Sequence, residues 1–152
     1  MRRLLLATAV AALALFTLAS PAGAVVLNGH GAETFVVSLA PSGDPNGSGF
    51  AVVNVNASTE KVCYVVFVRN IDQPQEPAPG LGSAHIHVLP SGAIAVDLEA
   101  SFRALGGDAY VASGCVHADA TVIENIVEHP ELYYVNVHTA AYPGGAVQGA
   151  LG

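Results

Sequence analysis

Short runs in which apolar and polar residues alternate recur along the chain after residue 32 and predict β-strands. In the run 50–56, for example, Ala51, Val53 and Val55 share one face of an extended chain. The next run, 61–69, is apolar on both faces, which predicts a central, buried strand that forms a hairpin with 50–56. The predicted strands are 33–39, 50–56, 61–69, 84–89, 93–99, 110–117, 133–139 and 146–151.

One segment changes from strand spacing to helix spacing. The apolar residues of 122–127 form a helical stripe and a proline follows soon after, which predicts a short helix near 119–129. Asp119 can cap the N-terminus of this helix, and Thr121 with Glu124 offers an alternative capping box. About eight strands and one helix, separated by segments rich in proline and glycine, indicate an all-β fold, an antiparallel sandwich or barrel.

The N-terminus has the pattern of a cleavable secretory signal. Arg2 and Arg3 precede the apolar run 4–19, which is shorter than the stretch of about 20 residues that spans a bilayer. Small residues at 22–24 predict cleavage after Ala24, and an uncleaved anchor is the alternative. We therefore expect a signal peptide over 1–24, one domain over 25–152, no membrane span after cleavage, and a secreted or extracytoplasmic location in periplasm, cell wall or medium.

Cleavage would leave a strongly acidic domain. Removing Arg2 and Arg3 changes the formal net charge from −7 to −9, because only Lys61, Arg69 and Arg103 then oppose twelve acidic residues. Such a surface repels phosphate backbones, which excludes nucleic acid as a partner. The two cysteines, Cys63 and Cys115, both lie in the expected mature chain. An even count in an exported protein predicts one disulfide, and two buried free thiols are the alternative.

Three histidines form the candidate for chemistry. His85 and His87 occupy alternate positions of one predicted strand, so they face the same way, with Ala84 and Ile86 opposite them. In the predicted strand 133–139, His138 lies on the face opposite the apolar one. If the two strands are neighbours, the three imidazoles predict a copper or zinc site with an open position. The alternative is an exposed strand face whose histidines bond neighbouring loops and bind no ligand.

The sequence shows no catalytic signature, and we expect no catalytic residue, no further cofactor and no enzyme activity. It contains no GxSxG, no phosphate-binding glycine loop and no HExxH motif. Asp97 and Glu99 share one face of a predicted strand, and a solvated edge is the favoured interpretation. The remaining histidines, His30, His117 and His129, are weaker candidates that we expect to face solvent or to occupy mobile or helix-terminal positions.

Two segments carry a family resemblance. The stretch AHIH at 84–87 and the run YYVNVHTAAYPGGAVQGAL at 133–151 are similar to the CHRD domain, named after chordin, and the likeness covers roughly 33–151. The segment 88–92 departs from the glycines that the family tends to place after AHIH. The resemblance implies an immunoglobulin-like β-sandwich. A looser likeness to copper–zinc superoxide dismutase, also a sandwich with His-x-His and a later histidine, is one of fold and ligand spacing only.

The resemblance also bears on function. In chordin, such domains belong to an extracellular antagonist that acts by binding proteins, and stand-alone bacterial members have no settled activity. We therefore expect a secreted CHRD module that binds a protein or an envelope or matrix component without catalysis. Copper or zinc binding through His85, His87 and His138 is the alternative function.

Overall fold

A computed structural model of the chain, which describes residues 25–29 and 32–152, consists mainly of antiparallel strands with one α-helix. The strands are β1 (Val25–Gly29), β2 (Ala32–Pro41), β3 (Ser48–Asn56), β4 (Lys61–Arg69), β5 (Ala84–Val88), β6 (Ala93–Asp97), β7 (Arg103–Gly106), β8 (Ala109–His117), β9 (Tyr133–Val137) and β10 (Val147–Ala150). The helix is α1 (Ala120–Glu128), and the 3₁₀ turns are η1 (Ala57–Thr59) and η2 (Pro130–Leu132). The predicted signal peptide over 1–24 lies outside the described residues.

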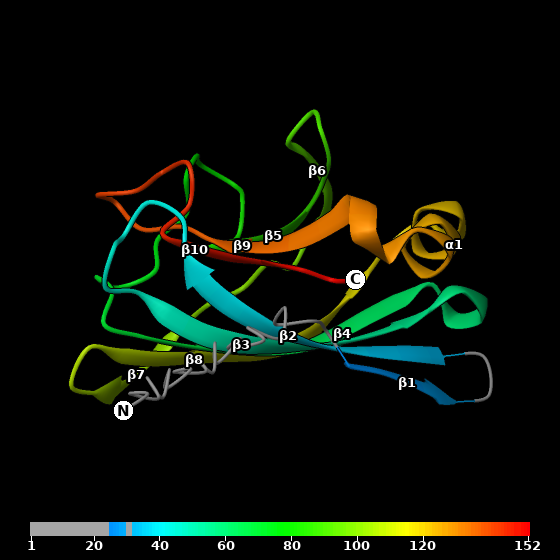
Figure 1. Cartoon of the computed structure of the whole chain (residues 1–152), viewed down its shortest axis with the longest axis horizontal. Helices are drawn as coiled ribbons and strands as arrows, with labels where there is room; N and C mark the ends of the chain where they lie inside the picture. The colour runs from blue at the N-terminus through cyan, green and yellow to red at the C-terminus, as the bar shows by residue number, and fades with distance from the viewer. Residues whose placement is uncertain (1–24, 30–31) are drawn as a thin grey trace, which may run out of the picture.

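The strands form one curled sheet that folds into two layers. Its order is β6-β5-β9-β10-β2-β3-β4-β8-β7, with β1 added to β2. The long strand β2 passes from one layer to the other, because it pairs with β3 along most of its length and with β10 at its end. Figure 1 shows the two layers stacked, with β5, β6, β9 and β10 above and the longer strands below. The predicted all-β sandwich with one short helix is therefore confirmed.

The hydrophobic core fills the space between the layers. Alternate residues of each long strand are buried there, such as Phe35 of β2 and Val53 of β3. The helix α1 closes one end of the sandwich and buries Ile123 and Ile126. The Asp119 side chain accepts a hydrogen bond from the backbone N–H of Thr121, so Asp119 caps the helix, as the first of the two predicted alternatives requires.

The strand count differs from the prediction at two places. The strand β1 was not expected, and β7 falls within a segment, 102–108, that was expected to be a connection. The residues of β7 are all exposed, and the strand ends at Gly106, which has a positive φ like Gly107 after it, so β7 carries no alternation that would reveal a strand. Hydrogen bonding to the regular strand β8 holds this edge strand in place.

The strand β4 is central but is not buried on both faces. It pairs with β3 on one side and β8 on the other, as a central strand does. Its inward residues lie in the core, whereas Lys61, Val65 and Arg69 on the outward face are exposed. The prediction of a fully buried strand was wrong, because the sandwich has only two layers and nothing that the structure describes covers the outer face of β4.

The two cysteines form a disulfide between neighbouring strands. Cys63 of β4 and Cys115 of β8 are direct partners in the antiparallel register, and their sulfurs are bonded. The predicted crosslink is thus present in the structure. Cys115 is exposed and Cys63 is half-buried, so the bond lies on the outer face of the lower layer.

Candidate metal centre

Strand pairing brings the three predicted histidines together. The strands β5 and β9 are neighbours, and His85 lies opposite Asn136 in their register. His138 follows the end of β9, where its backbone N–H donates to the carbonyl of Ser83 at 2.9 Å. The condition on which the predicted cluster depended, that these two segments are adjacent, is therefore met.

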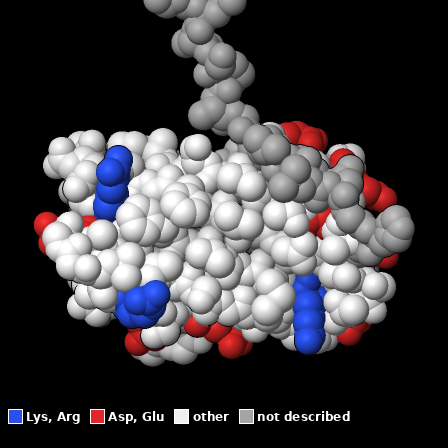
Figure 2. Space-filling view, turned by 90° about the horizontal axis from the view of Figure 1, so that it is seen from below, with Lys and Arg blue, Asp and Glu red and all other residues white. Residues whose placement is uncertain are grey.

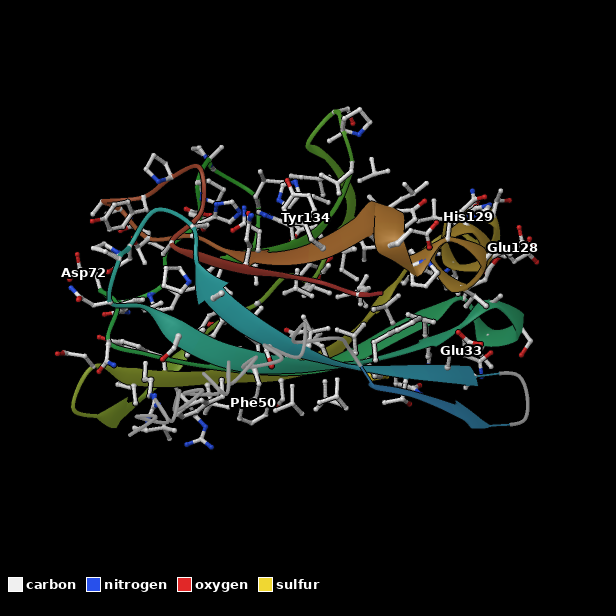
Figure 3. The ribbon with its side chains drawn as sticks, viewed as in Figure 1. Glu33, Phe50, Asp72, Glu128, His129 and Tyr134 are labelled. Atoms are coloured by element: carbon white, nitrogen blue, oxygen red, sulfur yellow. A yellow bond between two sulfur atoms is a disulfide. The ribbon has the colours of Figure 1, made fainter. Side chains whose placement is uncertain are left out.

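One ring nitrogen from each of His85, His87 and His138 lies within 4.8 Å of the others. The shortest approach is 2.9 Å, between Nδ1 of His85 and Nε2 of His138. His87 stacks on Tyr134, with ring centroids 5.2 Å apart. Figure 3 shows Tyr134 on the outer side of the upper layer, which is the side that carries the cluster.

The histidines are buried, although they face away from the main core. Their exposed fractions are 0 % for His85, 7 % for His87 and 3 % for His138. The alternative was therefore wrong in expecting an exposed face, although two of the histidines do bond neighbouring loops, as it also expected. The segment that follows β5 and the segment between β9 and β10 both contribute carbonyls to the cluster, so irregular chain lies against a sheet face that the strand pattern alone would leave in water.

Two backbone carbonyls fix the orientation of two of the rings. Nδ1 of His87 lies 2.9 Å from the oxygen of Gly92, and Nδ1 of His138 lies 2.9 Å from the oxygen of Pro143. A carbonyl oxygen can only accept, so each Nδ1 carries the hydrogen, and Nε2 of each neutral ring holds a lone pair. Metal-binding histidines are characteristically held by such outer hydrogen bonds.

Asp97 is the acidic neighbour of the cluster. Its Oδ1 lies 3.6 Å from Nε2 of His85. The same carboxylate accepts hydrogen bonds from the backbone N–H groups of Gly82 at 3.1 Å and Glu99 at 2.8 Å. The interpretation of Asp97 and Glu99 as a solvated strand edge was incomplete for Asp97: β6 is an edge strand and Asp97 is partly exposed, but its carboxylate also anchors a loop and faces a buried histidine. Its position on β6 beside β5 could be found only from the pairing.

Burial keeps two of the rings neutral at neutral pH. Desolvation lowers the pKa of His138 from 6.5 to about 4, and the neighbouring His85 adds to the effect, while the bond to Pro143 opposes it. Desolvation also lowers the pKa of His85, although Asp97 acts in the opposite direction. Neutral imidazole is the form that binds metal ions.

The low pKa of His138 predicts that the metal-free protein loses stability in mild acid. In the unfolded chain His138 takes up a proton near pH 6.5, whereas in the folded protein it does so only near pH 4. The loss of folding stability therefore begins near pH 6.5 as the pH falls, and it is complete below pH 4. We expect the free energy of unfolding to fall by about 2 kcal/mol between pH 7 and pH 5 from this residue. Urea unfolding at the two pH values measures it. An equal fall in a His138→Gln variant would contradict the assignment.

Asn136 is a further buried polar residue of the site, opposite His85 in the pairing of β5 and β9. Its Nδ2 donates to the carbonyl of Gly144 at 3.1 Å, and its Oδ1 is buried without a partner. Gly145 has a φ of 125° and lies so close that a Cβ there would collide with the Asn136 amide. Only glycine fits this position, and the turn that it permits places the carbonyl of Pro143 against His138.

A polar cavity of 480 Å³ lies beside the cluster, with Glu76, Asp97 and Glu99 in its wall. Asp97 connects the two, because it lines the cavity and also faces His85. The three histidines are not part of the cavity wall. The imidazole nitrogens are therefore separated from this cavity.

The other histidines that the structure describes lie away from this site. His117 is exposed and lies 2.9 Å from a Glu60 carboxylate oxygen, and His129 is exposed at the end of α1. His30 lies outside the described residues. The residues that sequence reasoning missed are Asp97 as a neighbour of the cluster and the carbonyls of Gly92 and Pro143, which have no signature in a sequence.

Comparison with known proteins identifies the family. The family model described as the CHRD domain matches residues 24–151. The chain belongs to the CHRD domain family. Neither the curated proteins nor the solved structures that were compared with it gave a significant match. Among the described residues of this CHRD domain, no helix is long and apolar enough to cross a membrane.

Proposed function

We propose that this CHRD domain is an exported module that binds one copper or zinc ion through His85, His87 and His138. The observation that carries the proposal is the contact between Nδ1 of His85 and Nε2 of His138 at 2.9 Å. Both rings are buried, and each has its other nitrogen beside an oxygen atom. These contacts restrict which ring nitrogens of His85 and His138 can carry a hydrogen.

Neither neutral tautomer of His85 gives both of its ring nitrogens a favourable partner. If His85 carries its hydrogen on Nδ1, it donates to His138, but its Nε2 lone pair faces the Asp97 carboxylate. If the hydrogen is on Nε2, it faces Asp97 favourably, but two lone pairs meet at 2.9 Å. A cation between the two nitrogens removes the conflict. A proton could play that part, but burial lowers the pKa of His85, which favours a metal ion at neutral pH.

The third histidine adds a further unused lone pair. Nε2 of His87 is buried without a hydrogen-bond partner. Nitrogens bound at about 2.0–2.1 Å to one ion lie up to about 4 Å apart. The three histidine nitrogens lie within 4.8 Å of one another, so a small side-chain movement brings them to the distances that one ion requires. An all-imidazole set suits Cu(II) and Zn(II), and the general affinity order of divalent ions places Cu(II) above Zn(II).

The burial of the ligands supports binding rather than catalysis. The histidines are at most 7 % exposed and do not line the neighbouring cavity, so a molecule bound in that cavity would not contact them directly. Export is supported by the predicted signal peptide and by the disulfide, which persists in oxidising compartments. The ion would therefore be taken up outside the cytoplasm.

Calorimetric titration of the purified metal-free domain, residues 25–152, tests the proposal. We expect one equivalent of Cu(II) or Zn(II) to bind with micromolar or tighter affinity. The His87→Ala variant should bind at least about a hundredfold more weakly, because loss of a ligand costs more than loss of an outer partner. The matched control is His129→Ala, which removes an exposed histidine outside the cluster and should bind like the parent. Equal affinities in the parent and His87→Ala would refute the proposal.

A further inference from the structure

The outer face of the lower layer has an unusual distribution of charge. Lys61, Arg69 and Arg103 are the only Lys and Arg residues after residue 3 of the chain, and we call these three the basic residues. Lys61 and Arg69 occupy outward positions at the two ends of β4, and Arg103 pairs with Val111 on the same face. All of the basic residues of the expected mature chain therefore lie on one face of the sandwich.

Acidic residues are absent from the strand positions of this face that the structure describes, and the carboxylate of Glu60, which contacts His117, lies at its margin. The outward positions of β2, β3, β4, β7 and β8 that the structure describes hold neither Asp nor Glu, although the chain has twelve. In Figure 2, which views this face, basic residues lie on two sides of a broad uncharged middle and acidic residues lie at the margins. A domain of strongly negative net charge thus presents one locally positive face.

The middle of the face is apolar. Phe50 and Phe67 are direct partners across β3 and β4, and their rings stack with centroids 5.6 Å apart. Phe50 is 43 % exposed, and Val65, two residues before Phe67 on the same face, is 41 % exposed. The outer face of a two-layer sandwich normally carries polar residues, so this apolar middle, with Phe50 and Val65 exposed and Phe67 half-buried, is a candidate interaction surface.

We propose that this face binds an acidic protein partner. The apolar middle requires apolar side chains from the partner, and the surrounding cations require carboxylates, a combination that a protein surface supplies. A face-to-face contact with a second copy would bring like charges together. The proposed face is separate from the metal centre, which lies on the opposite layer.

Site-specific photo-crosslinking of the full chain in the cells that produce it tests the proposal. A benzophenone amino acid at Val65 reports on the middle of the face, and the same group at Ile94, an exposed apolar residue of β6 in the other layer, is the matched control. We expect an adduct from position 65 only, with a protein whose crosslinked peptide is rich in Asp and Glu. The adduct should fall at least tenfold in an Arg69→Glu, Arg103→Glu double variant.

Other outcomes overturn the proposal. Crosslinks to lipid or to a second copy of the chain would identify a different occupant. If position 65 forms no adduct, the face does not bind a partner under these conditions. An adduct that survives both charge reversals means that charge does not select the partner. The disulfide and the urea midpoint of the double variant, measured on purified protein, must match those of the parent, so that lost crosslinking reports on the surface rather than on folding.

Discussion

Reduction of the Cys63–Cys115 disulfide is expected to lower the free energy of unfolding by about 4 kcal/mol, the loop-closure value for two cysteines 52 residues apart. The crosslink joins β4 and β8, which lie next to each other in the lower layer, and the chain between them includes β5, β6 and β7. In the reduced, unfolded chain this long loop opens, and its entropy then opposes folding. Urea unfolding with and without a thiol reductant measures the difference.

A Cys63→Ser, Cys115→Ser double variant is the control for this prediction. It should have the lower stability under both conditions and should not respond to the reductant. Because Cys115 is exposed, the reductant has access to the bond in the native protein. If the parent unfolds at the same urea concentration with and without reductant, the disulfide does not stabilise the fold.

Zinc at a free concentration about a thousandfold above its dissociation constant should stabilise the domain by about 4 kcal/mol. The reason is that a three-histidine site exists only when β5 and β9 pair, since 53 residues separate His85 from His138 in the chain. The unfolded chain therefore holds the ion weakly, and binding energy adds to the folding energy. Urea unfolding at several zinc concentrations gives the dependence.

The His138→Gln variant should lose this zinc-dependent stabilisation, whereas His129→Ala should retain it. Glutamine keeps a polar side chain in the buried site but removes the imidazole nitrogen that faces His85. A comparable gain in the His138→Gln variant would show that zinc stabilises the protein from another site.

The alternation of residues was sufficient to predict most of the strands and the direction of the histidine side chains. It placed His85 and His87 on one side of a strand and His138 on the polar side of another, and the structure agrees. It could not decide that β5 and β9 are neighbours, because pairing between strands far apart in sequence depends on the whole topology. The sequence therefore predicted the histidine cluster only on the condition that these two strands are neighbours.

Burial was the property that the sequence predicted least well. The histidine face was expected to be exposed if it bound nothing, but loops that contain Gly92 and Pro143 pack against it. Conversely, the apolar outward residues of β4 suggested burial on both faces, but Val65 is exposed. A strand pattern records which residues share a face, whereas loops and partners that cover the face leave no periodic signal.

Anomalous diffraction at the copper absorption edge, from crystals of the domain grown with one equivalent of Cu(II), tests the metal centre most directly. We predict a single strong peak about 2 Å from Nδ1 of His85 and from Nε2 of His87 and His138. A peak at the chain terminus or at the exposed His117 or His129, with none among the three buried rings, would contradict the proposed function.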